Sequence, residues 1–550
     1  MFVALALAAK GSGDASILVL SAALAFLWLS YLALAPAAAG PSVSGAGFCV
    51  AAFALWIVGT NLFVSSSYTA IAQYHAAFLF GGYLYGRRTS PRLEMAYRTL
   101  LALGIALSAW GFWQVLAEGE PRAHGPLIAP ATFAAVLNLV ILPGAVLLAA
   151  GTRRPWLAAA LGLVALAVVV STSRGAWLAL AGAGGCGLLL LHRAGRAIRW
   201  TKASAAASLL LVLIAGAWAL SQMQRPTGSG GFTGGWEGFG SLQPRLELFR
   251  LAVGETRSTD LVSGAGYDTF YYALERGRGA VPTYAEGFTH FVHNDYLQTL
   301  YELGLPGLTA LLLAIALPLA RAWRRIPHLP ATEQTTAIAA LSTVSAMALQ
   351  ALVDFPFYIP ICLLIFGAAL GVLDATFDSA SPARVRPPSF ALARRVLSAA
   401  AGTLAAWVLI TPAVAEAASL RGAERLRNSD GQGAAFWFEA ARRIDPRDWR
   451  YHWYAGQFWM SQAETTTDPV QAALADAALV RAIEANPRQP RPLSTRIALH
   501  DRLRGLLKNP ANGETMRAWA EQLVALAPTE AGVRAERDRI FKRFPPGDRK

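Results

Sequence analysis

Long apolar runs recur along the first three quarters of the chain. Each holds roughly 20 residues, the length that an α-helix needs to cross the hydrocarbon core of a bilayer. We predict about twelve spans, at residues 15–36, 46–65, 67–86, 97–117, 127–150, 155–171, 175–191, 203–221, 296–320, 332–353, 357–374 and 391–411. The pattern therefore predicts an all-α fold, a polytopic membrane helix bundle occupying residues 1–411.

After residue 411 the pattern changes to amphipathic, alanine-rich helices that carry many charges. Three of these helices end in a proline, at Pro446, Pro487 and Pro528, so successive prolines are 41 residues apart (487 − 446 and 528 − 487). This resembles tetratricopeptide repeats, whose usual period is about 34 residues. A generic bundle of helical hairpins is the alternative. We predict a second domain of helical repeats over residues 412–550.

A long polar segment, residues 222–295, separates two spans. It begins with the glycine-rich stretch RPTGSGGFTGGWEGFGS, which is typical of a flexible loop or lid. A phosphate-binding G-x-x-x-x-G-K-[ST] loop after a strand is not present. Residues 242–253 follow with helical apolar spacing, which predicts a short amphipathic helix.

Composition agrees with the membrane class. The 550 residues are 55% hydrophobic and 15% charged, and the mean hydropathy is +0.39, which lies outside the range of soluble globular proteins. A net charge of +14 is typical of nucleic-acid binding when it forms one patch. Here the basic residues are instead spread over short loops at alternate helix junctions, so we predict no nucleic-acid partner.

The distribution of these basic residues predicts the orientation of the helices. Loops rich in Arg and Lys face the cytoplasm. The basic loops contain Arg87, Arg88, Arg92, Arg98, Arg153, Arg154, Arg193, Arg196, Arg199, Lys202, Arg321, Arg324, Arg325, Arg384, Arg386, Arg394 and Arg395. We therefore place Arg174, residues 222–295, the turn 354–358 and everything after about residue 411 outside the cytoplasm.

The most informative stretch for chemistry is HFVHNDYLQTLYELGLPG, which leads into the span 296–320. A polar cluster at the mouth of a membrane helix is costly unless it faces water or performs a reaction. The imidazole of His293 is the candidate catalytic group, because it can take a proton from a hydroxyl or orient that hydroxyl. His290, Asn294 and Asp295 are candidate supporting residues.

Two other interpretations of this cluster stay open. His290, His293 and Asp295 could bind a metal ion, although no HExxH motif is present and the three cysteines lie inside spans. Alternatively, His293 or Asp295 could simply cap the following helix. We predict no metal and no cofactor.

Three arginines on the predicted extracytoplasmic side are candidate anion ligands. Arg174 lies in STSRG at the end of a span, and Arg245 and Arg250 precede the GAGYDTF segment. Guanidinium groups suit phosphate because they are planar, permanently charged and can donate two hydrogen bonds at once. Alternatively, Arg174 extends to the membrane interface, and the other two are solvated surface residues.

Other polar residues lie within or between the spans. Asp354, in the turn LVDFPFYIP, is either a counter-ion for an arginine or a polar residue at a helix end. Asn138 and Glu302 lie inside predicted spans, and their roles are similarly open.

Taken together, HNDYLQ, ELGLPG, GAGYDTF and STSRG give the chain a family resemblance. Roughly residues 60–375 resemble the O-antigen ligase and polymerase superfamily of bacterial membrane glycosyltransferases. That superfamily includes O-antigen ligases, protein O-oligosaccharyltransferases and exopolysaccharide polymerases. The chain departs from it where LIAPATFAA replaces an asparagine-rich element.

The resemblance implies a reaction. The donor would be a glycan linked to undecaprenyl diphosphate, a lipid-linked oligosaccharide, and the acceptor would be a glycan, a lipid A-core or a protein. Arg174 and Arg245 would hold the diphosphate and His293 would assist the acceptor hydroxyl, without metal or nucleotide.

Two alternatives to a ligase or polymerase remain open. The helical repeats suit a partner protein, for example in an export complex, or a protein O-oligosaccharyltransferase. A transporter of lipid-linked saccharide would carry polar residues at several mid-span positions, whereas here they gather near one face.

Overall fold

The computed structural model describes residues 45–63, 69–89, 93–127, 129–150, 155–195, 242–277, 290–379, 411–412 and 414–545. Throughout these ranges the regular structure is helical and no strand occurs. The predicted spans 15–36, 203–221 and, except for its last residue, 391–411 lie outside the described residues, as does the glycine-rich stretch 225–241.

Each of the other predicted spans coincides with a helix. These helices are α3 (Gly45–Phe63), α4 (Thr69–Thr89), α5 (Leu93–Leu116), α6 (Pro130–Ala149), α7 (Pro155–Val170), α8 (Arg174–Arg193), α13 (Asp295–Arg325), α14 (Ala331–Gln350) and α15 (Pro360–Ser379). Stretches within α5, α6, α8, α13 and α15 are long and apolar enough to cross a membrane. The all-α membrane fold is confirmed, whereas the total of about twelve spans stays a prediction.

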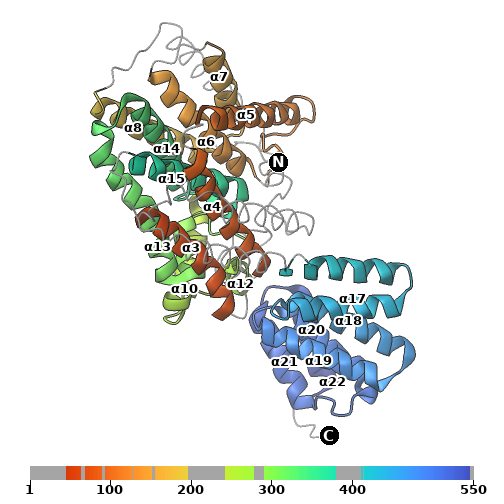
Figure 1. Ribbon diagram of the computed structural model, residues 1–550. Coiled ribbons are helices and arrows are strands. Elements are labelled where there is room, and N and C mark those ends of the chain that lie inside the picture. The colour runs from red at the N-terminus through yellow and green to blue at the C-terminus, as the bar shows by residue number, and fades with distance from the viewer. Residues whose placement is uncertain are drawn as a thin grey trace, which may run out of the picture.

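Helices α4 and α15 pack along each other with their backbones in contact (Figure 1). Both helices carry glycines four residues apart, Gly82 with Gly86 and Gly367 with Gly371. A Cβ added at Gly86 would collide with the carbonyl oxygen of Ala368, and the other three glycines meet the partner backbone in the same way. Small residues at this spacing allow the close helix approach that stabilises membrane bundles.

Helix α13 is broken at Gly304, near its start. The prediction of a continuous span over 296–320 did not anticipate this break. Gly304 has a φ of 66° and a ψ of −170°, and Pro306 has no N–H to donate. The carbonyl groups of the preceding turn therefore need donors from elsewhere. Ala265 N–H donates to Tyr301 (2.8 Å) and Gly266 N–H to Glu302 (3.0 Å), while Trp56 Nε1 donates to Leu303 (2.7 Å).

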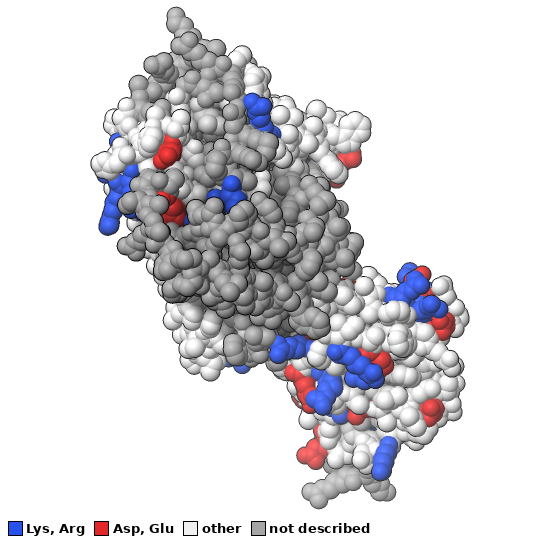
Figure 2. Space-filling model, in the orientation of Figure 1, with Lys and Arg blue, Asp and Glu red and all other residues white. Residues whose placement is uncertain are grey.

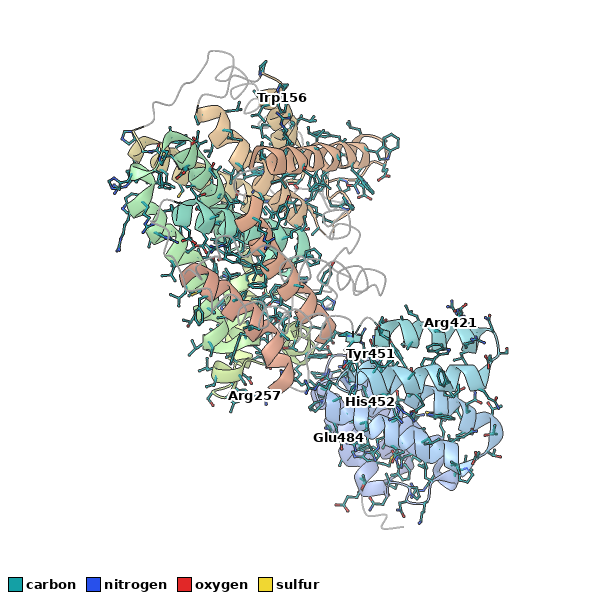
Figure 3. All side chains as sticks on the ribbon, in the orientation of Figure 1. Trp156, Arg257, Arg421, Tyr451, His452 and Glu484 are labelled. Carbon is teal, nitrogen blue, oxygen red and sulfur yellow. The ribbon has the colours of Figure 1, made fainter. Side chains whose placement is uncertain are left out.

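The two ends of the bundle carry different residues, and Figure 3 marks them by Trp156 and Arg257. At one end, which we name the Arg321 end, Arg87 and Arg321 bind the same two carboxylates, Asp374 and Asp378. The guanidinium of Arg193 lies 4.3 Å from the Trp323 ring centre at this end too. Basic residues of three loops predicted to be cytoplasmic thus share one end.

Helices after residue 414 pack on one another in chain order. They are a helix over 414–427, α17 (Gly431–Ile444), α18 (Trp449–Thr466), α19 (Pro469–Ala485), α20 (Pro490–Arg502), α21 (Gly513–Leu526) and α22 (Ala531–Arg543). Each of the three prolines, Pro446, Pro487 and Pro528, lies two positions after the last residue of a helix, α17, α19 and α21 respectively. Their assignment to tetratricopeptide repeats and the boundary at residue 411 stay predictions.

The surfaces of the two parts differ in charge. Figure 2 shows Lys, Arg, Asp and Glu side chains of both signs over the helices after residue 414, whereas the described surface of the bundle is mostly uncharged. This contrast agrees with a bundle that faces lipid and with helices after residue 414 that face water.

Candidate functional site

The polar stretch before α13 begins the site, and its local geometry is set by Asn294. This residue has an extended backbone (φ −156°, ψ 105°), and its side-chain oxygen accepts a hydrogen bond from Leu297 N–H at 3.0 Å. Asn294 is therefore the helix cap, and the interpretation in which His293 or Asp295 caps α13 is wrong. His293 precedes the cap in a left-handed conformation (φ 59°).

Asp295 fastens the start of α13 to the turn between α14 and α15. Its backbone N–H donates to the carbonyl of Ala351 at 2.8 Å, and its buried carboxylate accepts from Phe357 N–H at 2.8 Å. Asn294 adds a hydrogen bond from Nδ2 to the carbonyl of Leu352 at 3.0 Å. These bonds place the turn 351–358 directly beside His293.

Asp354, in that turn, is the charged neighbour of His293. The distance from His293 Nδ1 to Asp354 Oδ1 is 3.5 Å, and the imidazole meets the ring of Phe355 edge-on at 5.1 Å. Asp354 is only 2% exposed, and Gln350 Nε2 donates to its other oxygen at 3.3 Å. A buried carboxylate at this position orients an imidazole.

Arg122 brings the arginines and Asp354 together, although the sequence did not single it out. It lies in the loop between α5 and α6, and its Nε donates to the carbonyl of Ser171 at 3.1 Å. Burial and the charges of Arg174 and Arg245 lower the pKa of Arg122, whereas the carboxylate of Asp354 raises it. Arg122 therefore lies within electrostatic range of Arg174, Arg245 and Asp354, and we name these four residues the Arg122 group.

Two helices position Arg174 and Arg245. The hydroxyl of Ser173 caps α8, so Arg174 occupies the first helical position, where its side chain is exposed. Arg245 lies half-buried in α10 (Leu242–Glu255), which confirms the predicted amphipathic helix. Leu248 of α10 packs in a small core with residues of α12 (Phe270–Gly277) and α13.

Two predicted supporting residues lie apart from the Arg122 group in the contacts of the described residues. Arg250 is exposed and follows Arg245 by five residues, so the two side chains leave α10 on different faces. His290 is exposed, and its ring stacks on that of Tyr271 at 5.0 Å. They therefore serve as neighbouring controls for Arg245 and His293.

The GAGYDTF segment wraps around Glu302 in α13. The backbone N–H groups of Asp268 (2.8 Å), Thr269 (3.1 Å) and Phe270 (3.2 Å) all donate to the Glu302 carboxylate. Gln298 Nε2 donates at 3.1 Å, and the hydroxyl of Tyr358 donates as well. Glu302 is fully buried, so its role is to hold the segment against α13 rather than to face a ligand.

Tyr358 is well suited to donate to this carboxylate. Burial and then the negative charge of Glu302 raise the pKa of the Tyr358 hydroxyl well above its usual range, so the hydroxyl keeps its proton. Asn138 is likewise structural, since its Nδ2 joins α6 to α8 by donating to the carbonyl of Ala176 at 2.8 Å.

We expect Glu302→Ala to destabilise the fold strongly, because each buried donor left without a partner costs about 1–3 kcal/mol. Thermal unfolding in detergent should show a lower midpoint for Glu302→Ala than for wild type. Glu302→Gln, which keeps an acceptor oxygen, should unfold in between. An unchanged midpoint for Glu302→Ala would show that this carboxylate does not hold the segment.

The ligand chemistry of the site favours an anion. The ranges that the structure describes contain no group of three or more His, Cys, Asp or Glu side chains that could hold a metal ion. Three guanidinium groups within electrostatic range of one another, Arg122 with Arg174 and Arg245, suit an anion such as a phosphate ester.

The fold and site define a class, an all-α membrane protein with an arginine group beside a histidine at one end of the bundle. Residues 159–312 match the family model described as O-antigen ligase, and this match supports the resemblance of the chain to the O-antigen ligase and polymerase superfamily. The matched residues include Arg174, Arg245 and His293, whereas Arg122 and Asp354 lie outside them. No curated protein matches the chain.

Proposed function

We propose that the protein is a membrane glycosyltransferase that moves a glycan from undecaprenyl diphosphate to an acceptor hydroxyl at the periplasmic face of the inner membrane. The match to the O-antigen ligase family supports the class of reaction. The observation that carries the assignment to this end of the bundle is the Arg122 group beside His293.

The donor diphosphate binds to the arginines of this group. Arg122, Arg174 and Arg245 supply three permanent positive charges, which offset the charge of the diphosphate in the ground state. They also stabilise the extra charge that develops on the diphosphate as the bond to the sugar breaks. The position of Arg174 at the end of a span suits a headgroup whose lipid tail stays in the membrane.

His293 acts on the acceptor. The acceptor oxygen attacks the anomeric carbon, the bond from that carbon to the diphosphate oxygen breaks, and the hydroxyl proton passes to Nε2 of His293. Asp354 Oδ1 is buried and has no hydrogen-bond partner among the described residues. With His293 Nδ1 at 3.5 Å, a small ring rotation lets Nδ1–H donate to Asp354, which leaves Nε2 free to accept the proton.

The proposed orientation follows from the basic residues. Arg87, Arg193 and Arg321 meet at the Arg321 end, and basic loops favour the cytoplasm. The His293 end, at the other end of α13, then faces the periplasm. The helices after residue 414 would lie in the periplasm as well.

A product assay tests the proposed function. Purified protein is incubated with a lipid-linked oligosaccharide and candidate acceptors, with and without EDTA, and the products are identified by mass spectrometry. We expect covalent transfer that EDTA does not reduce, because arginines neutralise the leaving group. A growing ladder identifies a polymerase, one transfer to lipid A-core a ligase, and a modified protein an O-oligosaccharyltransferase. Movement of intact donor across a membrane without any covalent product would contradict transfer and identify a transporter.

A further inference from the structure

The turn between α19 and α20 contacts the segment that wraps Glu302. Asn486 Nδ2 donates to the hydroxyl of Tyr272 at 2.9 Å, and Gln489 Nε2 lies 3.5 Å from the same oxygen. Arg488 Nη1 donates to the carbonyl of Ala265 at 3.0 Å. Figure 1 shows the repeat helices meeting the bundle at this place, near α12. We name residues 486–489 the docking turn.

The contacts of Asn486 and Gln489 with Tyr272 are buried and that of Arg488 with Ala265 is partly buried, so they are costly to break. Asn486 is fully buried, and Tyr272 is 2% exposed. A buried donor or acceptor that loses its partner cannot turn to water instead. The docking turn is therefore a built contact between the two parts of the chain.

The docking turn is the second of three turns at equivalent places in the sequence. Residues 445–448 and 527–530 occupy the same place one period earlier and one period later. Arg447 is the counterpart of Arg488, 41 residues earlier (488 − 447), and its side chain is exposed. The first turn therefore offers a matched control for the second.

The contacted segment holds the start of α13. The carbonyl of Ala265 accepts from Arg488, while the N–H of the same residue donates to Tyr301 in α13. Three and four residues further on, Asp268 and Thr269 donate to Glu302. Tyr301 lies eight residues after His293 (301 − 293), so the cap Asn294 and the first two turns of α13 join this part of the helix to the histidine. A displacement of the segment therefore shifts the start of the helix that carries His293 at its N-terminus.

We propose that the docking turn positions His293 for glycan transfer. The helices after residue 414 then help to set the geometry of the site. The inference rests on the proposed function. Asn486, Arg488 and Gln489 are then positioning residues, acting through Ala265, Tyr272 and the start of α13. A displacement of about 1 Å at a reacting group lowers a rate by as much as about 100-fold.

The full-length double variant Tyr272→Phe/Arg488→Ala tests this inference, with Arg447→Ala as the matched control. We expect the double variant to lower kcat by at least about 10-fold with an unchanged KM for the donor, since the arginines stay in place. The double variant Tyr272→Phe/Arg488→Lys should have a higher kcat than Tyr272→Phe/Arg488→Ala, because an ammonium can still donate to the Ala265 carbonyl. Arg447→Ala should match wild type.

Hydrogen exchange of the backbone amides of residues 265–270 provides a readout that does not require activity. We expect faster exchange in the double variant and wild-type exchange in Arg447→Ala. Wild-type exchange in the double variant, or faster exchange with wild-type kcat, would overturn the inference. If the wild-type protein transfers no glycan, the proposed function fails, and the exchange result still decides whether the docking turn holds the segment.

Discussion

Replacing His293 with Ala should abolish glycan transfer by the purified protein. The variant lacks the group that accepts the acceptor proton, and general-base catalysis contributes about 100- to 10,000-fold to a rate. The fold should persist, because Asn294 caps α13 and Asp295 fastens it to the turn 351–358. Initial rates with a lipid-linked oligosaccharide donor measure the loss.

The matched control for this variant is His290→Ala. His290 lies three residues earlier, is exposed, and stacks on Tyr271 rather than facing Asp354. It should therefore keep the wild-type rate. A His293→Ala protein that transfers glycan as fast as the His290→Ala protein would remove His293 from the proposed catalytic role.

Replacing Arg122 with Ala should weaken use of the donor. Hydrogen bonds to charged groups contribute about 1.5–3 kcal/mol each, so we expect kcat/KM for the donor to fall by about 10- to 100-fold. Arg122→Lys should retain an intermediate activity, because it keeps the charge but loses the planar fork. Steady-state kinetics with varied donor concentration separate the three proteins.

Arg250→Ala is the control for this arginine. Arg250 is exposed on α10 and follows Arg245 by five residues, so its loss removes a charge nearby without removing a member of the Arg122 group. We expect wild-type kinetics for Arg250→Ala. Equal kinetics for Arg122→Ala and Arg250→Ala would show that Arg122 has no part in donor binding.

The course of the chain through the membrane could largely be predicted from the sequence, because it depends on local composition. An apolar run of about 20 residues must be helical in lipid, wherever its neighbours lie. The break in α13 was harder to foresee. Its sequence signal is Gly304 with Pro306, but the break also needs donors from Ala265, Gly266 and Trp56 to satisfy the freed carbonyl groups.

The sequence identified Arg174, Arg245 and His293 as candidates because they stand in recognisable motifs. It missed Arg122, since an arginine in the polar loop AEGEPRAHG has the appearance of a solvated surface residue. Only the contact with Ser171, 49 residues away, and the nearby charges distinguish it. Interactions between distant residues cannot be read from local pattern.

The cap of α13 illustrates a smaller limit. Asn and Asp are about equally good helix caps, and HNDYLQ offers both in adjacent positions. Sequence pattern places a helix start only to within a few residues. In the structure, Asn294 takes the cap, and Asp295 is thereby freed to bind Phe357 and fix the turn that carries Asp354.

The central claim is that the arginines bind the donor diphosphate and that His293 acts on the acceptor. Equilibrium binding of the lipid-linked oligosaccharide donor tests this claim most directly. Binding is compared for wild type, His293→Ala and the double variant Arg174→Ala/Arg245→Ala. We predict wild-type affinity for His293→Ala, although it transfers no glycan, and a loss of binding for the arginine variant. Wild-type affinity in the arginine variant, or a loss of donor binding in His293→Ala, would contradict the account.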